Sequence, residues 1–273
     1  MIAPESPSAK GYDPLYAAFD SPLMRRLRQE AYGEDIGQHS WVTADELRSD
    51  LRRLSLTTSS RLLDVGCGPC GPLVFAVKST GCMGTGLDLS AAAIDSGRAR
   101  ALAAGVQDRV ALLEADLNLP VPLVGSSFDA AISLDVVVHL GNRMAFFHEM
   151  ARLLVPAGRL LFTDAGVITG TISNEEVAQR SVNGYTQFVP PGVNEQLLEA
   201  AGFRLIEQDD TTGSVLFNAS GRLRAMLAHQ VEIEALGGKE AFAQQQRYLE
   251  TVVALSERRA LSRIMYFAEL VTV

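Results

Sequence analysis

The stretch Leu62-Leu-Asp-Val-Gly-Cys-Gly-Pro-Cys-Gly71 decides the fold of this chain. Its first four residues predict a short buried strand, and the loop that follows places Gly66, Gly68 and Gly71 at the spacing GxGxxG. Glycines there let the backbone turn sharply and let a ligand approach main-chain N–H groups that a Cβ atom would block. Pro72 favours a helix that begins at about Gly71, because proline suits a first helical turn. The motif alone also fits NAD and FAD sites, so its surroundings must decide the ligand.

Three further apolar segments end in acidic residues. Residues 82–89 predict a strand ending near Asp88, where a carboxylate can accept hydrogen bonds from a ribose diol. Residues 110–117 predict a strand ending near Asp116, which can accept a hydrogen bond from an adenine amino group. Residues 130–134 predict a fourth strand. Ligands of open α/β sheets bind at the carboxyl ends of the strands. The acidic residues expected at this edge are Asp64, Asp88, Asp116 and Asp135.

Strands alternate with helical patterns along the chain, which predicts an α/β fold with a doubly wound, mostly parallel sheet. Residues 12–34 show a helical pattern, and Thr43 begins another helix. After the fourth strand, a helix is expected at 143–155, where Pro156 ends it, followed by strand 159–164. The last two strands are expected at the following residues: 203–208 and 264–273.

Two inserts interrupt the alternation. Residues 166–193 are rich in Thr, Ser, Asn, Gly and Pro, and residues 211–261 are mostly helix-forming. A helical lid over the carboxyl edge of the sheet explains the second insert, because lids exclude water and complete active sites. A dimerisation element is the alternative explanation.

Glycine loop, ribose acid, adenine acid and the segment after the fourth strand, in this order, resemble the class I S-adenosylmethionine-dependent methyltransferases. The resemblance covers residues 55–165 well. The rest is most similar to the small-molecule branch that includes phosphoethanolamine, sarcosine/dimethylglycine and tocopherol methyltransferases. The segments that carry this second likeness are Tyr32-Gly33-Glu34-Asp35, Asp135-Val-Val-Val-His139-Leu140, Gly184-Tyr185-Thr186 and Arg263-Ile-Met-Tyr266-Phe267.

The resemblance implies a seven-stranded, Rossmann-like methyltransferase fold. Residues 1–54 would form an N-terminal helical cap, and residues 55–273 the methyltransferase domain, with inserts 166–193 and 211–261 as a substrate lid. The cofactor would be S-adenosyl-L-methionine and its product S-adenosyl-L-homocysteine. The glycine loop would hold the methionine end, with Asp64 either reaching the ammonium group or ordering the loop. The residues expected to bind the cofactor are Asp64, Gly66, Cys67, Gly68, Asp88, Leu89, Asp116, Leu117, Leu134, Gln38 and His39.

His139 is the candidate general base of the implied methyl transfer, because an acceptor nitrogen or oxygen must lose its proton. Relatives in the phosphoethanolamine group pair such a histidine with an N-terminal tyrosine, and Tyr12 and Tyr16 are the candidates here. A structural alternative is that His139 satisfies helix-end carbonyl groups. Asp135 would bind a cationic group or else cap the following turn. The expected substrate-binding residues are Asp135, Tyr16, Tyr185 and Tyr266.

One departure from the phosphate-binding relatives narrows the chemical class of the methyl acceptor. They carry an arginine just before the tyrosine of the first insert, where this chain has Ser181-Val-Asn183-Gly184. Losing a bidentate arginine disfavours a phosphorylated acceptor, unless Arg258 or Arg259 replaces it. A neutral or amine-bearing metabolite is therefore expected, methylated on nitrogen or oxygen. The alternatives are C-methylation of a natural-product or prenyl-type substrate, and a non-catalytic, cofactor-binding partner subunit.

Bulk properties exclude other classes of function. The net charge of −8 argues against binding nucleic acid, because a phosphate-binding surface needs a basic stripe. The sequence shows no long apolar run or signal peptide, so no membrane association and a cytoplasmic location are expected. Cys67 and Cys70 form a CxxC without further ligands, so no metal is expected. The chain would act on a small-molecule methyl acceptor, as a monomer or a homodimer.

Overall fold

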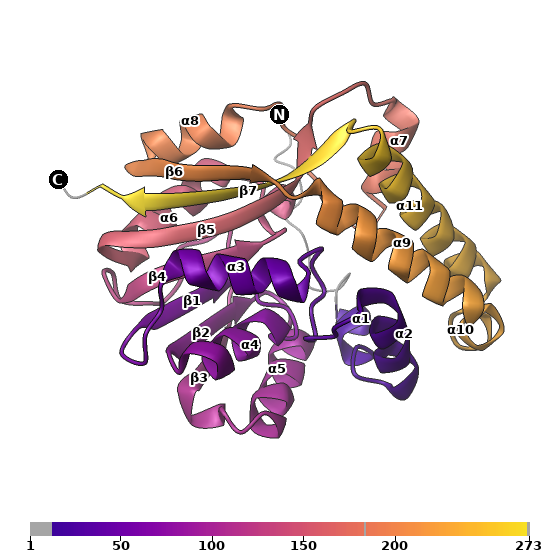
Figure 1. Cartoon of the computed structure of the whole chain (residues 1–273), viewed down its shortest axis with the longest axis horizontal. Coiled ribbons are helices and arrows are strands. Elements are labelled where there is room, and N and C mark those ends of the chain that lie inside the picture. Colours follow the sequence, from indigo (N-terminus) through magenta and orange to yellow (C-terminus); the bar gives the residue numbers. More distant parts are fainter. Residues whose placement is uncertain (1–12, 183, 272–273) are drawn as a thin grey trace.

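A computed structural model of the chain describes residues 13–182 and 184–271 and shows one seven-stranded sheet covered by helices (Figure 1). The strand order is β3-β2-β1-β4-β5-β7-β6, and β7 runs antiparallel to both of its neighbours. The order reverses beside β1, as in a doubly wound sheet. The predicted fold class is therefore confirmed. The strands are β1 (Arg61–Val65), β2 (Met83–Asp88), β3 (Val110–Glu114), β4 (Phe128–Leu134), β5 (Leu154–Ile168), β6 (Phe203–Asp210) and β7 (Leu261–Leu270).

The helices follow the predicted alternation and add the two inserts. The described helices are α1 (Asp13–Ala17), α2 (Pro22–Tyr32), α3 (Ala44–Leu54), α4 (Gly71–Thr80), α5 (Ala91–Ala103), α6 (Arg143–Leu153), α7 (Asn174–Arg180), α8 (Val193–Ala200), α9 (Thr212–Ala228), α10 (Gln230–Gly237) and α11 (Lys239–Glu257). Short 3₁₀ turns lie at η2 (Gln107–Arg109) and η3 (Val137–His139). Within the described part of the chain, none of these helices combines the length and the apolar character that crossing a bilayer requires.

The two largest apolar clusters of the described residues lie on opposite faces of the sheet. Neighbouring strand residues point to opposite faces, so Leu161 packs in one cluster and Phe162 in the other. Helices α3 and α4 cover the first cluster, whereas α6 and α8 cover the second. Both faces are buried, which explains why the strands read as nearly continuous apolar runs in the sequence.

Several predicted boundaries differ from the observed ones, and three of these differences concern the helices and strands around the expected site. The helical pattern over residues 12–34 is two helices, because Ser21 caps α2 and Pro22 occupies its first turn. The third strand stops at Glu114, so Asp116 and Leu117 lie in the following turn. Pro156 does not stand between α6 and a strand. It lies inside the longer β5, where the pairing with β4 shifts register and so tolerates a proline.

The lid (helices α9–α11) lies beside the N-terminal cap (residues 13–54) and is bonded to it (Figure 1). Asn218 donates hydrogen bonds to the carbonyl groups of Trp41 (2.8 Å) and Val42 (3.2 Å). Arg222 donates to the carbonyl of His39 (2.7 Å), and its guanidinium carbon lies 4.4 Å from the centre of the Trp41 ring. Two segments far apart in the sequence therefore form one structural layer.

Gly221 provides a test of this packing. A Cβ atom at Gly221 would lie 2.1 Å from the carbonyl oxygen of Ala31 in α2, whereas a Cβ at Gly213 would meet no atom within 4 Å. Gly221→Ala should lower the free energy of unfolding by about 1–3 kcal/mol through overpacking. Gly213→Ala, in the same helix, should leave it unchanged or raise it through helix propensity. Denaturant melts of both variants check this, and equal stability of the two would contradict the close packing.

Candidate functional site

The glycine loop joins β1 to α4 at the carboxyl edge of the sheet. Gly66 has φ +76°, and a Cβ atom there would lie 2.4 Å from the Val136 side chain. A Cβ atom at Gly71 would lie 2.2 Å from the carbonyl oxygen of Gly37 in the cap. The N–H groups of Gly66 and Cys67 both donate to the carbonyl of Leu87, at 2.8 and 2.9 Å. The predicted turn and the start of α4 at Gly71 are confirmed, and the cap lies directly on the loop.

The two loop cysteines are buried free thiols. Cys67 Sγ and Cys70 Sγ are 3.3 Å apart. The hydrogen bond from Cys70 and burial raise the pKa of Cys67 well above its usual value, so the thiol stays protonated and unreactive. Among the described residues, no group of three or more His, Cys, Asp or Glu side chains is arranged to hold a metal ion.

Asp88 joins the glycine loop to the start of α5. Its Oδ2 accepts from the N–H of Gly68 (2.8 Å), and its Oδ1 accepts from the N–H of Ser90 (2.9 Å). Ser90 itself caps α5. A carboxylate has about four acceptor positions, so Asp88 can still accept bonds from a ribose diol. The neighbouring Leu89 is half-buried.

Asp64 is a buried carboxyl group that lacks a complete set of partners. It is 2% exposed, and its Oδ2 has no hydrogen-bond partner among the described residues. Burial, together with the charge of Asp88, raises the pKa of Asp64 to about 8. The group is therefore neutral at pH 7 in this state. A cation placed beside it would stabilise the carboxylate, so this orphaned group fits the ammonium end of the expected cofactor.

Asp116 lies in a turn at the same edge. Its Oδ1 accepts from both nitrogen atoms of Asn118, each at 2.9 Å, and Asn118 in turn accepts from the N–H of Gly141. Asp116 and Leu117 are half-buried, and Leu134 is buried at the end of β4. The turn keeps part of the Asp116 carboxylate open, as an adenine contact requires.

Three predicted residues of the cap gather over the glycine loop. The ring of His39 meets the ring of Tyr16 edge-on, with 5.4 Å between centroids. The Tyr16 hydroxyl lies 3.4 Å from the position of a Cβ atom at Gly68. Burial and the charge of Arg222 lower the pKa of His39 to about 3, so this ring is neutral. Gln38 is fully buried and closes the turn of the cap through the N–H of Ile36. Tyr12 lies outside the described residues.

Asp135 is held by a network that the sequence did not reveal. Its Oδ2 accepts from the N–H of Trp41 (2.8 Å), and its Oδ1 accepts from Thr163 (2.9 Å) and from Arg263 Nε (2.7 Å). Arg263 is fully buried and also contacts Glu46 of the cap. A lone arginine in the apolar last strand was the available signal, because a buried charge needs partners. The structure thus gives Asp135 a structural role, and its contact with a substrate stays a prediction.

His139 ends the 3₁₀ turn that follows β4, and the first insert covers it. Its Nδ1 lies 2.9 Å from the carbonyl oxygen of Tyr185. A carbonyl only accepts, so Nδ1 carries the proton and Nε2 is the basic nitrogen of the neutral ring. Burial and the charge of Arg180 lower the pKa of His139 below its usual 6.5. The ring is therefore neutral at pH 7, as a general base must be.

The two predicted tyrosines differ in placement. Tyr185 is half-buried next to His139 and offers its main-chain carbonyl there. Tyr266 is 1% exposed in the core, stacked on Phe162 with 4.7 Å between centroids. Burial raises the pKa of Tyr266. The structure therefore gives no support to a substrate-binding role for Tyr266.

Comparison with known proteins identifies the domain that carries this site. The family model of the methyltransferase domain matches residues 63–162. Methyltransferase GfsG of Streptomyces halstedii is 31% identical over 166 residues, which are 59% of this chain and 58% of that protein. The 27-O-demethylrifamycin SV methyltransferase of Amycolatopsis mediterranei is 30% identical over 181 residues, 63% of this chain and 62% of that protein. The matches thus span less than two thirds of these relatives.

Solved structures share the fold over nearly the whole chain. The cyclopropane synthase MmaA2 of Mycobacterium tuberculosis superposes with a TM-score of 0.80 at 16% identity, covering 97% of this chain and 99% of that one. Phosphoethanolamine N-methyltransferase 2 of Haemonchus contortus gives 0.79 at 19% identity, covering 96% and 59%. That enzyme was solved with phosphomonomethylethanolamine and S-adenosylhomocysteine. More distant relatives are named as O-, N- and C-methyltransferases.

The uncompensated burial of Asp64 generates a pH-dependent prediction. Between pH 3.8 and about 8, folded Asp64 holds a proton that the unfolded chain has lost. The free energy of unfolding therefore falls as pH rises through this window, by up to about 1.4 kcal/mol per pH unit from this group. Asp64→Asn cannot titrate, so its stability advantage over the wild type should grow from pH 5 to pH 9 in denaturant melts. The exposed Asp108→Asn is the control, and parallel pH profiles for wild type and Asp64→Asn would contradict the account.

Proposed function

Since this chain carries a class I S-adenosylmethionine-dependent methyltransferase domain, we propose that it transfers a methyl group to nitrogen or oxygen of a small-molecule metabolite. One observation carries the proposal. Within the matched domain, the glycine loop, Asp88 and Asp116 stand together at the carboxyl edge of the sheet. Asp64, whose Oδ2 lacks a partner in the described part of the chain, lies beneath the loop. Such an edge is where open α/β sheets bind their ligands.

The described residues fit each part of S-adenosylmethionine. Asp64 offers a carboxyl group to the ammonium, and the loop at Gly66, Cys67 and Gly68 offers main-chain groups to the methionine end. Asp88, with Leu89 beside it, would bind the ribose, and Asp116 with Leu117 the adenine. Leu134, Gln38 and His39 would complete the enclosure. Solved methyltransferases of this fold hold S-adenosylmethionine or S-adenosylhomocysteine, which supports the assignment.

When bound, the cofactor supplies an electrophilic methyl group on a positively charged sulfur. The protein must hold the acceptor in line with that group and keep water out, and such orientation can contribute up to about 7–11 kcal/mol to the lowering of the barrier. Asn218 and Arg222 of the lid donate hydrogen bonds to the cap. Cap and lid together would cover the carboxyl edge of the sheet and keep water from the reacting groups. His139 accepts the acceptor's proton at Nε2, while the Tyr185 carbonyl fixes its ring. A base at this place favours acceptors that must lose a proton, namely amines and hydroxyl groups.

Cofactor binding tests the proposal directly. Asp88→Ala removes the ribose acceptor and should weaken S-adenosylhomocysteine binding at least about tenfold, as expected for loss of a hydrogen bond to a charged group. Isothermal titration calorimetry measures this, with the exposed Asp108→Ala as the matched control. Because Asp88 also holds the N–H of Gly68, the circular dichroism and melting temperature of the variant are compared with wild type. Unchanged affinity in a folded Asp88→Ala variant, or wild type that binds NAD but not S-adenosylhomocysteine, would overturn the proposal.

The role of His139 predicts a second set of outcomes. For any acceptor that takes up a labelled methyl group, His139→Ala should lower kcat about 10²–10⁴-fold and leave the affinity for S-adenosylhomocysteine unchanged. His148→Ala, on the exposed side of α6, should have no effect. Since the pKa of His139 lies below 6.5, wild-type kcat should hold from pH 8 down to about 6.5 and fall at lower pH. A His139→Ala variant with wild-type kcat would exclude a catalytic role.

A further inference from the structure

The segment of the first insert that covers His139 is fixed to the framework at several points. In this covering segment (residues 185–189), the Tyr185 carbonyl meets His139 Nδ1 at 2.9 Å. The N–H of Gln187 donates to the carbonyl of Val138 (2.7 Å), which precedes His139 in the chain. The last residue of the segment forms a parallel bridge to β5. The position of the covering segment therefore decides which ring nitrogen of His139 carries the proton.

Arg143, the first residue of α6, bonds to the middle of the covering segment. Its Nη2 donates to the main-chain carbonyl of Gln187 (2.7 Å), and its Nε donates to Gln187 Oε1 (3.2 Å). A Cβ atom at Gly166 of β5 would lie 2.6 Å from the Val138 side chain and 3.4 Å from the Gln187 carbonyl oxygen. The covering segment, β5 and the turn of His139 are therefore in close contact where Arg143 bonds to Gln187.

Arg143 is an unusual residue for this position. It is 4% exposed, and a buried cation needs partners. It also lies in the first turn of α6, where the helix dipole opposes a positive charge. Its Nη1 bonds to the carboxylate of Asp164 and to Asn194 Oδ1 (2.8 Å), and both of these partners are buried. Nη1 therefore pairs with the framework, whereas Nη2 and Nε bond to the covering segment.

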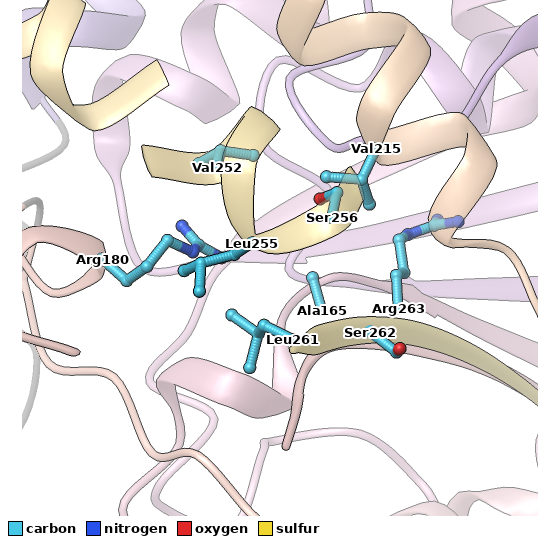
Figure 2. Close-up of a pocket in the computed structure, with 9 residues that line it drawn as sticks. All are labelled: Ala165, Arg180, Val215, Val252, Leu255, Ser256, Leu261, Ser262 and Arg263. Carbon is cyan, nitrogen blue, oxygen red and sulfur yellow. The ribbon is translucent and has the colours of Figure 1, made fainter. Parts of the chain in front are cut away.

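Two other buried arginines near the insert bond elsewhere. Arg180 and Arg263 stand on opposite sides of a small cavity between the lid and β7 (Figure 2). This cavity of about 10 Å³ has room for about one water molecule. Among the described residues, Arg180 donates to Tyr248 of α11, and Arg263 donates to the network of Asp135. In the described structure, Arg143 is therefore the arginine that holds the covering segment.

We propose that Arg143 is a positioning residue for the candidate base His139. By holding Gln187, it keeps the Tyr185 carbonyl on Nδ1 and leaves Nε2 to accept the proton of the methyl acceptor. A base in the wrong tautomer cannot accept that proton, and a displacement of about 1 Å at a reacting group costs about 10²-fold in rate. This inference rests on the proposed methyl transfer and identifies the group that orients its base.

Arg143→Lys separates the two sides of the guanidinium group. A lysine keeps a positive charge beside Asp164 but lacks the planar fork that also reaches Gln187. The tautomer is measured by NMR on protein with ¹⁵N-labelled histidine, with and without S-adenosylhomocysteine. Wild type should carry the His139 proton on Nδ1, and Arg143→Lys should show a mixture of both tautomers. The spectrum of His139→Ala identifies the resonances of this ring among the four histidines.

The rate of methyl transfer should follow the tautomer. For any acceptor that takes up a labelled methyl group, Arg143→Lys should lower kcat about 10–100-fold and leave KM and the affinity for S-adenosylhomocysteine unchanged. Arg152→Lys is the matched control. Arg152 also bonds to a carboxylate and to main-chain carbonyl groups, but it lies about 13 Å further along α6. It should change neither kcat nor the His139 spectrum.

A second variant keeps the test independent of folding. Arg143→Met combined with Asp164→Asn removes both charges, so no buried charge is left unpaired, and it should show the same mixed tautomer. Circular dichroism and the melting temperature show whether each variant is folded.

A single Nδ1-protonated tautomer or a wild-type kcat in either folded variant would overturn the positioning role. Wild type with the His139 proton on Nε2 would overturn it too, as would a fall in kcat matched by an equal loss of affinity for S-adenosylhomocysteine. The NMR measurement needs no acceptor. A wild type that transfers no methyl group therefore rejects the proposed function separately.

Discussion

The buried ion pair between Arg263 and Asp135 holds the carboxyl edge of the sheet together. Arg263 comes from β7 and Asp135 from the end of β4, and Thr163 of β5 stands between them with hydrogen bonds to both. The cap enters the same network through Glu46 and the N–H of Trp41. Burial alone would lower the pKa of Arg263, but the two carboxylates outweigh it and raise the pKa. Removing one partner of such a pair costs about 3–5 kcal/mol.

This network also shows which charged groups at the carboxyl edge are neutralised by protein partners and which lack a complete set of partners. Buried polar groups are nearly always paired, so an unpaired one calls for a reason. Asp135 and Arg263 satisfy each other, whereas Asp64 and Arg180 have incomplete sets of partners in the described structure. Asp64 lies in β1, directly before the glycine loop. A buried carboxyl group with an unfilled acceptor position suits a cationic group of a ligand.

The sequence predicted those features of the fold that depend on residues close together in the chain. The loop from Gly66 to Gly71, the start of α4 at Gly71 and the acid at the end of β2 follow from short-range rules, and the structure has them where expected. Residues whose role depends on distant partners escaped prediction. Arg263 looked like part of a strand motif, because its partners lie more than a hundred residues away in the chain.

The placement of Tyr266 and Arg180 also depends on distant parts of the chain and could not be predicted from the sequence. Both side chains belong to segments that the sequence marked as substrate-facing, yet the sheet turns Tyr266 into the core, where it stacks on Phe162. A strand residue faces one side or the other according to register alone, and no local signal in the last strand fixed that register. Arg180 went unnoticed because its lack of a carboxylate partner can be seen only once α7 and α11 are packed together.

Cap and lid are mechanically linked, and this has a consequence for how the two ligands of a methyl transfer would enter. The cap lies on the glycine loop, with the Gly37 carbonyl against Gly71. Asn218 and Arg222 of the lid donate hydrogen bonds to that same cap, and these bonds go to main-chain carbonyl groups rather than to flexible side chains. Moving the cap off the loop therefore either carries the lid along or breaks these bonds. Access to the glycine loop beneath the cap is therefore tied, through these hydrogen bonds, to the position of the lid.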